Sequence, residues 1–147
     1  MRDYTKIKAW QLADDLAVEI YRVTKSFPKD ELYAMTSQIR RAASSVPANI
    51  VEGASRNSHK DYLHFLYIAR GSLHETHYFI HLAGRLNYIT QDSKQKLMAQ
   101  AEEVSRTLTG LIKAVEKEVG PVRRSVAKFT SLLVLSLSSV FSLSSSV

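Results

Sequence analysis

Histidine is the residue type in this sequence with the clearest capacity for chemistry. All five histidines lie between residues 59 and 81, and His74, His77 and His81 are spaced HxxHxxxH. On a helix these three side chains fall within about 60° of one face, a geometry that can hold a zinc ion. No nearby cysteine or carboxylate motif completes a ligand shell, and Arg70 shares the face, where its charge repels a dication. We therefore expect no metal here and no cofactor.

The same face has two other interpretations. The first is a partly exposed polar surface without a specific ligand. The second is a basic face whose charge increases as its histidines protonate below about pH 6.5. The members of this basic face are Arg70, His74, His77, His81 and Arg85.

A second candidate site lies between residues 38 and 57. Six polar residues recur there at three- and four-residue steps, so they share one side of a helix. They are Gln38, Arg41, Ser45, Asn49, Glu52 and Arg56, and we call them the polar stripe. Exposure to solvent alone does not explain why these residue types are aligned along one side of a helix.

The polar stripe has two interpretations. In one, its arginines contact phosphate while its amides and hydroxyl group bind sugar or base. In the other, Arg41, Glu52 and Arg56 form ion pairs with a second copy of the chain. Glu52 favours the second interpretation, because a carboxylate repels phosphate.

The sequence contains no motif of a known catalytic site. GxSxG, GxGxxG, HExxH and the P-loop are all absent. Glu52 and Glu75 are the one candidate carboxylate pair, but arginines lie close to both in the sequence. We interpret both as ion-pair partners, and we predict no catalytic residue and no enzymatic activity.

Composition leaves room for a nucleic-acid partner without requiring one. The net charge is +6, of which residues 121–147 contribute three basic residues and no acid. Residues 1–120 therefore carry 17 basic and 14 acidic residues, a modest bias. The absence of cysteine excludes disulfides, and the charged N-terminal residues do not resemble a secretion signal, so we expect a cytoplasmic location.

Apolar periodicity predicts four amphipathic helices. Their expected ranges are residues 8–26, 30–52, 58–87 and 90–120. Their short connections predict an all-α, antiparallel up-down-up-down four-helix bundle over residues 1–120. In the first helix the predicted core stripe includes Trp10 and Tyr21.

The second predicted helix contains the least regular sequence. Asp30 is its expected N-cap, and Gly53 is expected to follow its last turn. Pro47 predicts a kink, with two separate helices split at Val46 as the alternative. Gly71, in the third helix, indicates either close approach of a neighbouring helix or a tolerated surface glycine.

Capping residues mark the remaining boundaries. Ser58 with Asp61 resembles a capping box at the start of the third helix. Thr90 is the expected N-cap of the fourth helix, and Gly120 with Pro121 is expected to end it.

The C-terminal extension, residues 121–147, differs from the rest of the chain. Its segment 129–147 contains eight serines and no charge. A membrane anchor is one interpretation, but the serines make insertion marginal. We predict a poorly ordered, aggregation-prone extension and no membrane partner.

Several motifs resemble a known family. They are Phe27-Pro28, Glu31 to Tyr33, Gln38 to Ala42, Ser45 to Ile50, Glu52-Gly53, Arg56, Phe65, Ala69 to Leu73, and Glu75. This pattern resembles the small four-helix bundle proteins encoded in intervening sequences of bacterial 23S ribosomal RNA genes, often called S23 ribosomal proteins. The resemblance covers residues 3–118. The accessory protein of diversity-generating retroelements is similar as well.

The resemblance implies a non-enzymatic bundle that assembles into a homopentamer. It also implies contact with RNA or an RNA-handling protein, since the retroelement relative binds a reverse transcriptase and nucleic acid through a basic surface. The three-histidine face and the Ser/Leu-rich extension are not part of the family pattern. The alternative prediction is a purely structural or protein-interaction module with no nucleic-acid contact.

Overall fold

The computed structural model describes residues 2–120. Over this range the chain forms four long α-helices and no β-strand. The helices are α1 (Lys8–Val23), α2 (Ser37–Ser55), α3 (His59–Arg85) and α4 (Gln91–Val119). The predicted all-α helical bundle is therefore confirmed, while the predicted extension, residues 121–147, lies outside the described residues.

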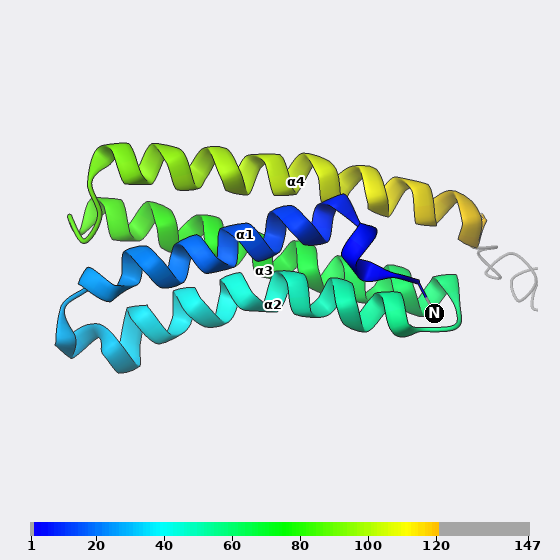
Figure 1. Cartoon of the computed structure of the whole chain (residues 1–147), viewed down its shortest axis with the longest axis horizontal. Coiled ribbons are helices and arrows are strands. Elements are labelled where there is room, and N and C mark those ends of the chain that lie inside the picture. Colours follow the sequence, from blue (N-terminus) through cyan, green and yellow to red (C-terminus); the bar gives the residue numbers. More distant parts are fainter. Residues whose placement is uncertain (1, 121–147) are drawn as a thin grey trace, which may run out of the picture.

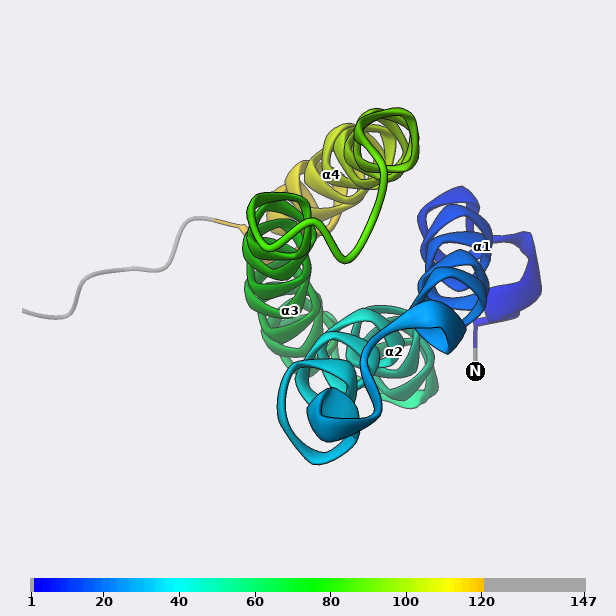
Figure 2. The same ribbon diagram turned by 90° about the vertical axis from the view of Figure 1, so that its left-hand side faces the viewer.

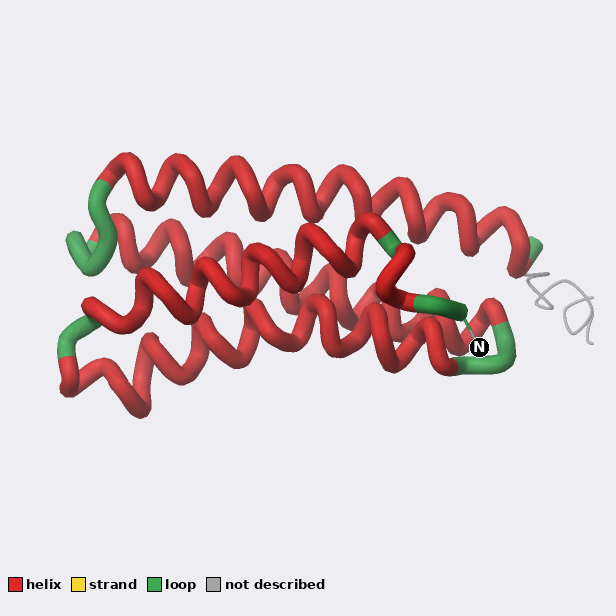
Figure 3. The backbone as a smooth tube through the Cα atoms, viewed as in Figure 1, coloured by secondary structure: helices red, strands yellow, loops and turns green. Residues whose placement is uncertain are grey.

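The four helices lie side by side along the long axis of the molecule. Their connections alternate between the two ends of the bundle (Figure 1). Viewed from one end, α2 and α4 each lie between α1 and α3, so every helix has two neighbours (Figure 2). The α2–α3 and α3–α4 connections are short, residues 56–58 and 86–90, whereas the α1–α2 connection, residues 24–36, consists largely of helical turns (Figure 3). Connections of this kind hold successive helices next to each other.

The core forms where the apolar stripes of the helices meet. Each helix contributes large side chains at three- and four-residue spacing that are almost completely buried. These include Leu16, Ile20, Ile39, Ile50, Leu66, Leu73, Ile80, Leu97, Leu108 and Ile112. Burial of these side chains supplies the main driving force for folding.

Two aromatic residues of α1 lie farther from the core than predicted. Trp10 is half-buried and packs edge-on against Tyr4, with their ring centroids 5.0 Å apart. Tyr21 is 46% exposed, so its predicted core position is wrong. Its ring instead packs against the guanidinium of Arg40, which lies 4.9 Å from the ring centroid. This cation–π contact favours a position of the Tyr21 ring at the edge of the bundle.

The connection between α1 and α2 differs most from the prediction. The α1 helix ends at Val23 rather than at residue 26, and α2 begins at Ser37 rather than after Asp30. The intervening turns are Thr24–Ser26 and Lys29–Glu31, which are 3-10 turns, and Leu32–Thr36, a π-helical turn. The backbone leaves helical geometry at Ala34, where φ is −108° and ψ is −108°. The break in the predicted second helix therefore lies at Ala34.

Glu31, and not Asp30, caps the turn that leads into α2. Its carboxylate accepts a hydrogen bond of 3.1 Å from the backbone N–H of Met35. It also accepts a hydrogen bond of 2.9 Å from the hydroxyl of Tyr88, in the α3–α4 connection. The ring of Tyr88 packs 5.5 Å from that of Phe27. These contacts tie the two connections at this end of the bundle together.

The α2 helix continues through Pro47 and past Gly53. It is one helix to Ser55, so neither the split at Val46 nor the predicted end before Gly53 occurs. Gly53 is buried because α3 approaches it closely: an added Cβ atom would lie 2.8 Å from Cδ2 of Tyr62. The close approach proposed for Gly71 therefore occurs at Gly53. At Gly71 a Cβ atom would meet nothing within 4 Å.

The predicted caps of α3 and α4 are confirmed. The Ser58 hydroxyl oxygen accepts from the N–H of Asp61 at 3.0 Å, and the Thr90 hydroxyl oxygen accepts from the N–H of Ser93 at 3.2 Å. Gly120 ends α4 with a φ of 72°, a conformation that glycine adopts at no steric cost. No helix among the described residues is long and apolar enough to span a membrane.

Buried Tyr62 predicts a loss of stability at high pH. Burial raises the pKa of its phenol above the ordinary value of 10.0, although nearby Arg2 opposes the shift. The unfolded chain therefore loses this proton first. The contribution of Tyr62 to the free energy of unfolding is fully present below its pKa in the unfolded chain. It is lost as the pH rises through its pKa in the folded protein. We expect the free energy of unfolding of Tyr62→Phe to fall less steeply than that of the wild type above about pH 10.

Urea unfolding at several pH values checks this prediction. Tyr78→Phe is the matched control because Tyr78 is 58% exposed, and we expect it to keep the wild-type pH dependence. Equal slopes for wild type and Tyr62→Phe would show that Tyr62 is not the group responsible.

Candidate functional site

The polar stripe lies along the edge of α2 that adjoins α3. At its N-terminal end the Arg41 guanidinium donates hydrogen bonds to the side chains of Gln38 at 3.1 Å and Glu75 at 3.0 Å. Glu75 belongs to α3, so this ion pair joins the two helices. The Arg41 and Glu75 side chains are 64% and 39% exposed, and the pair therefore contributes less than about 1 kcal/mol to stability.

The middle of the polar stripe is a half-buried hydrogen-bond network. Asn49 Nδ2 donates to the Ser45 carbonyl at 2.8 Å and lies 3.0 Å from Ser45 Oγ. Ser45 Oγ also accepts a hydrogen bond of 3.0 Å from Ser72 Oγ on α3. These hydrogen bonds connect the three side chains across the boundary between α2 and α3.

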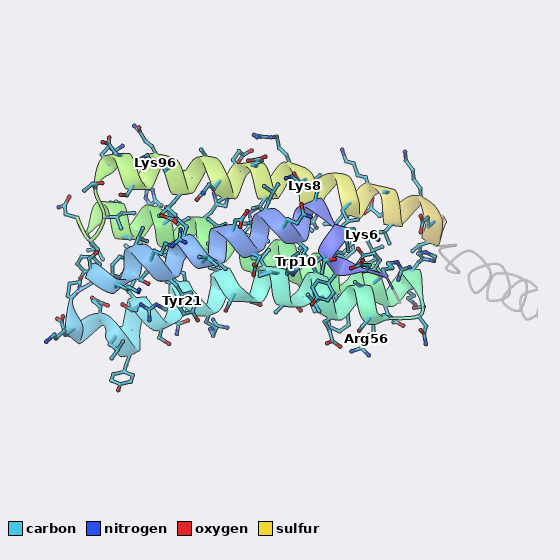
Figure 4. All side chains as sticks on the ribbon, viewed as in Figure 1. Lys6, Lys8, Trp10, Tyr21, Arg56 and Lys96 are labelled. Carbon is cyan, nitrogen blue, oxygen red and sulfur yellow. The ribbon has the colours of Figure 1, made fainter. Side chains whose placement is uncertain are left out.

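The C-terminal end of the polar stripe is a second ion pair. Arg56 bonds to Glu52, one helical turn earlier, and its guanidinium lies 4.9 Å from the ring centroid of Phe65 on α3. Figure 4 shows Arg56 projecting from the bundle near the α2–α3 connection. The interpretation of Glu52 and Glu75 as ion-pair partners of arginine is confirmed.

The structure thus brings all six residues of the polar stripe together along the α2–α3 boundary. Both of its arginines already have a carboxylate partner within the chain. Its role as an RNA contact or as an interface between copies remains a prediction.

The basic face lies on α3 and is open to solvent. Arg70, His74, His81 and Arg85 are exposed and His77 is half-buried. Within residues 2–120 none of the five forms an ion pair, in contrast to the arginines of the polar stripe.

Arg70 rests on an aromatic ring at one end of the basic face. Its guanidinium lies 4.9 Å from the ring centroid of Tyr67. The Tyr67 hydroxyl donates a hydrogen bond of 2.6 Å to Glu116 of α4, and this bond raises the pKa of Tyr67. The ring is thereby held in place, so one terminus of the basic face has a fixed position.

The described part of the chain contains no recognisable group of metal-binding side chains. Among residues 2–120, no three His, Cys, Asp or Glu side chains come together in an arrangement that would hold a metal ion. His74, His77 and His81 share a face of α3, but within residues 2–120 they do not form such a group, either with one another or with a carboxylate.

A further site, absent from the sequence prediction, lies at the α1–α2 connection. It is a pocket of about 480 Å³ that we call the corner pocket. Its lining residues are Thr24, Lys25, Phe27, Pro28, Lys29, Leu32, Thr36 and Arg40. They come from the three turns that follow α1, the residues between those turns and the first part of α2, so no single periodic pattern in the sequence connects them.

The corner pocket combines positive charge with an apolar wall. Lys25, Lys29 and Arg40 form no ion pair within the described residues, and no acidic residue lines the pocket. Arg40 is held in place by a hydrogen bond of 2.8 Å from its Nε to Thr24 Oγ1. Two lysines that flank Phe27-Pro28 were the signal available in the sequence, but only the turns bring Arg40 close to them.

Comparison with known proteins identifies the family. A family model described as the 23S rRNA-intervening sequence protein matches residues 5–110. The chain is similar to a crystal structure of a protein of unknown function from the S23 ribosomal protein family of Bacteroides thetaiotaomicron, with a TM-score of 0.67 and 28% identity. That similarity covers 71% of this chain and 98% of the other. No functionally curated protein matches the chain.

The family match covers most of the bundle, from the turn before α1 to the second half of α4, and includes every residue of the polar stripe and the basic face. This chain therefore belongs to the 23S rRNA-intervening sequence protein family.

Proposed function

We propose that this protein is a non-catalytic helical bundle that assembles with copies of itself and associates with RNA or with an RNA-handling protein. The observation that carries the proposal is the basic face of α3, whose charges have no acidic partner within residues 2–120. Membership of a family linked to 23S rRNA genes supports RNA as the polyanion. We propose a cytoplasmic location, which is consistent with a family described by its link to ribosomal RNA.

The basic face has a suitable length for a nucleic-acid backbone. Arg70 and Arg85 are 15 positions apart on one helix, or about 22 Å at 1.5 Å per residue. Several consecutive phosphates fit within that length. Arg41 and Arg56 are weaker candidates for phosphate contact because Glu75 and Glu52 already neutralise them.

Self-assembly has separate support on the neighbouring surface of α3. Ile68 is 39% exposed and Tyr78 is 58% exposed, although both are large and apolar or aromatic. Gly71 lies between them in the helix, with open space where a side chain would be. Exposed apolar groups around a glycine favour close contact with another protein surface. We propose a second copy of this chain as the partner, and a pentamer as the complete assembly.

A salt titration tests the RNA proposal. We expect the full chain to bind single-stranded RNA with an affinity that falls steeply between about 50 and 200 mM salt. Each phosphate of a single strand that the protein neutralises adds about 0.7 to the slope of log affinity against log salt. Arg70→Gln/Arg85→Gln is therefore expected to lower this slope by about 1.4. Fluorescence anisotropy with a labelled oligonucleotide measures both the affinity and the slope.

The control is Lys8→Gln/Lys96→Gln, which removes the same charge from elsewhere on α1 and α4 (Figure 4). We expect it to keep the wild-type slope. An equal decrease in both double variants would assign binding to net charge and not to the basic face.

The second candidate function is a structural or protein-interaction module without nucleic-acid contact. The exposure of Ile68 and Tyr78 favours it. Absence of RNA binding at low salt, together with a stable oligomer in light scattering, would support this function and exclude the first.

A further inference from the structure

The corner pocket has the composition of a site for an anion attached to a flat apolar group. Lys25 and Lys29, both exposed, provide ammonium groups to its lining. Phe27, Pro28 and Leu32 provide an apolar wall, and Phe27 is fixed by its packing against Tyr88. The volume of about 480 Å³ lies within the range of small-ligand pockets.

We infer that the corner pocket binds one nucleotide unit, with the phosphate between Lys25 and Lys29 and the base against Phe27, Pro28 and Leu32. A nucleotide matches both halves of the pocket, since it joins a charged phosphate to a planar ring. A simple inorganic anion would leave the apolar wall unused.

Thr36 provides independent support. It is 3% exposed, and its hydroxyl is a buried polar group without a hydrogen-bond partner within the described residues. Such groups are rare in folded proteins because an unpaired buried hydroxyl loses its hydrogen bonds to water without replacing them. Thr36 lines the corner pocket, and threonine populates two χ1 rotamers in helical backbone. A ligand atom in the pocket would give this hydroxyl its missing partner.

A neighbouring pocket favours a strand over a free nucleotide. It measures about 430 Å³, lies between α1 and α2, and is lined in part by Lys25, which the two pockets share. Tyr21 and Arg22 also line it; Tyr21 is 46% exposed, whereas Arg22 forms an ion pair with Glu19, which leaves Lys25 as the unpaired cation of this pocket within the described residues. Asp14 is its acidic lining residue. Alternating aromatic and cationic groups along a groove are typical of sites for single-stranded nucleic acid.

Single-stranded RNA is accordingly the ligand, running from the corner pocket along the α1–α2 groove. This assignment rests on the proposed function, but the pocket is on a different part of the molecule from the basic face of α3. The two sites can therefore be tested separately.

The test uses the full chain with two probes, adenosine 5′-monophosphate and a short single-stranded oligoadenylate. The key variant is Lys25→Gln/Lys29→Gln, because both side chains are exposed and neither forms a hydrogen bond within residues 2–120. The control is again Lys8→Gln/Lys96→Gln. We expect the key variant to lose about tenfold in oligonucleotide affinity and about 1.4 in salt slope, and the control to match the wild type.

Amide chemical shifts locate the bound probe. We expect the oligonucleotide to shift residues 24–40 in the wild type. Thr36→Val, a near-isosteric change that removes the hydroxyl, is expected to weaken binding two- to tenfold without weakening the fold.

The outcomes separate the pocket from the proposed function. Oligonucleotide binding that is equal in the key variant, the control and the wild type would overturn the pocket while leaving RNA association by the basic face intact. Adenosine 5′-monophosphate bound in the pocket without any oligonucleotide binding would overturn the assignment of single-stranded RNA as the ligand and would contradict RNA association. If neither probe shifts residues 24–40, the inference is wrong.

Discussion

Gly53→Ala is expected to destabilise the bundle by about 1 to 2 kcal/mol. The new methyl carbon would lie 2.8 Å from Tyr62 Cδ2, 3.0 Å from Phe65 Cβ and 3.2 Å from the Tyr62 carbonyl oxygen. Tyr62 is 2% exposed, so its ring has little room to move. Overpacking of this kind costs about 1–3 kcal/mol, and the better helix propensity of alanine returns at most about 1 kcal/mol.

Gly71→Ala is the matched control for this prediction. It is the same substitution in a helix interior, but nothing lies within 4 Å of the added methyl group. We expect it to stabilise the monomer by about 0.5 to 1 kcal/mol. Urea unfolding of both variants measures the difference, and a Gly53→Ala protein as stable as Gly71→Ala would show that α2 and α3 are not in close contact there.

Leu66→Ala is expected to lower the free energy of unfolding by about 2 to 5 kcal/mol. Leu66 is 0% exposed in the centre of the bundle. Its truncation removes buried apolar surface and leaves a cavity that rigid neighbouring helices fill only in part. For a domain of this size such a decrease is a large fraction of the total stability. Thermal and urea unfolding monitored by circular dichroism provide the measurement.

Ile68→Ala, two residues along the same helix, is the comparison for Leu66→Ala. Ile68 is 39% exposed, so we expect a decrease of less than about 1 kcal/mol in the monomer. If the α3 surface mediates self-assembly, Ile68→Ala should instead reduce the native mass measured by light scattering. An unchanged mass across the concentration range would remove Ile68 from the proposed interface.

Apolar periodicity was sufficient to predict most of the fold. The spacing of residues such as Leu66, Leu73 and Ile80 predicts the buried face of α3, because burial in a bundle repeats with the helical turn. Capping chemistry was equally local, so Ser58 and Thr90 predicted helix starts within one residue. Features that depend on three or four consecutive residues could therefore be predicted from the sequence.

The errors occurred where a distant contact decides the local structure. Gly53 is typical of a helix end, yet α2 continues to Ser55, and the glycine instead allows the close approach of α3. Glu31 caps the turn before α2 while also binding Tyr88, which is far away in the sequence. Neither contact can be deduced from local propensity.

The candidate sites divide in the same way. The sequence by itself determined which residues share the polar stripe and the basic face, because helical spacing alone places them. The pairing of Arg56 with Glu52 is local, one helical turn apart, but only the tertiary structure decided that Glu75 of α3 neutralises Arg41 while the basic face has no carboxylate partner among residues 2–120. Only the tertiary structure assembled Lys25, Lys29 and Arg40 into a pocket, because three successive turns set their positions and no periodicity extends across turns.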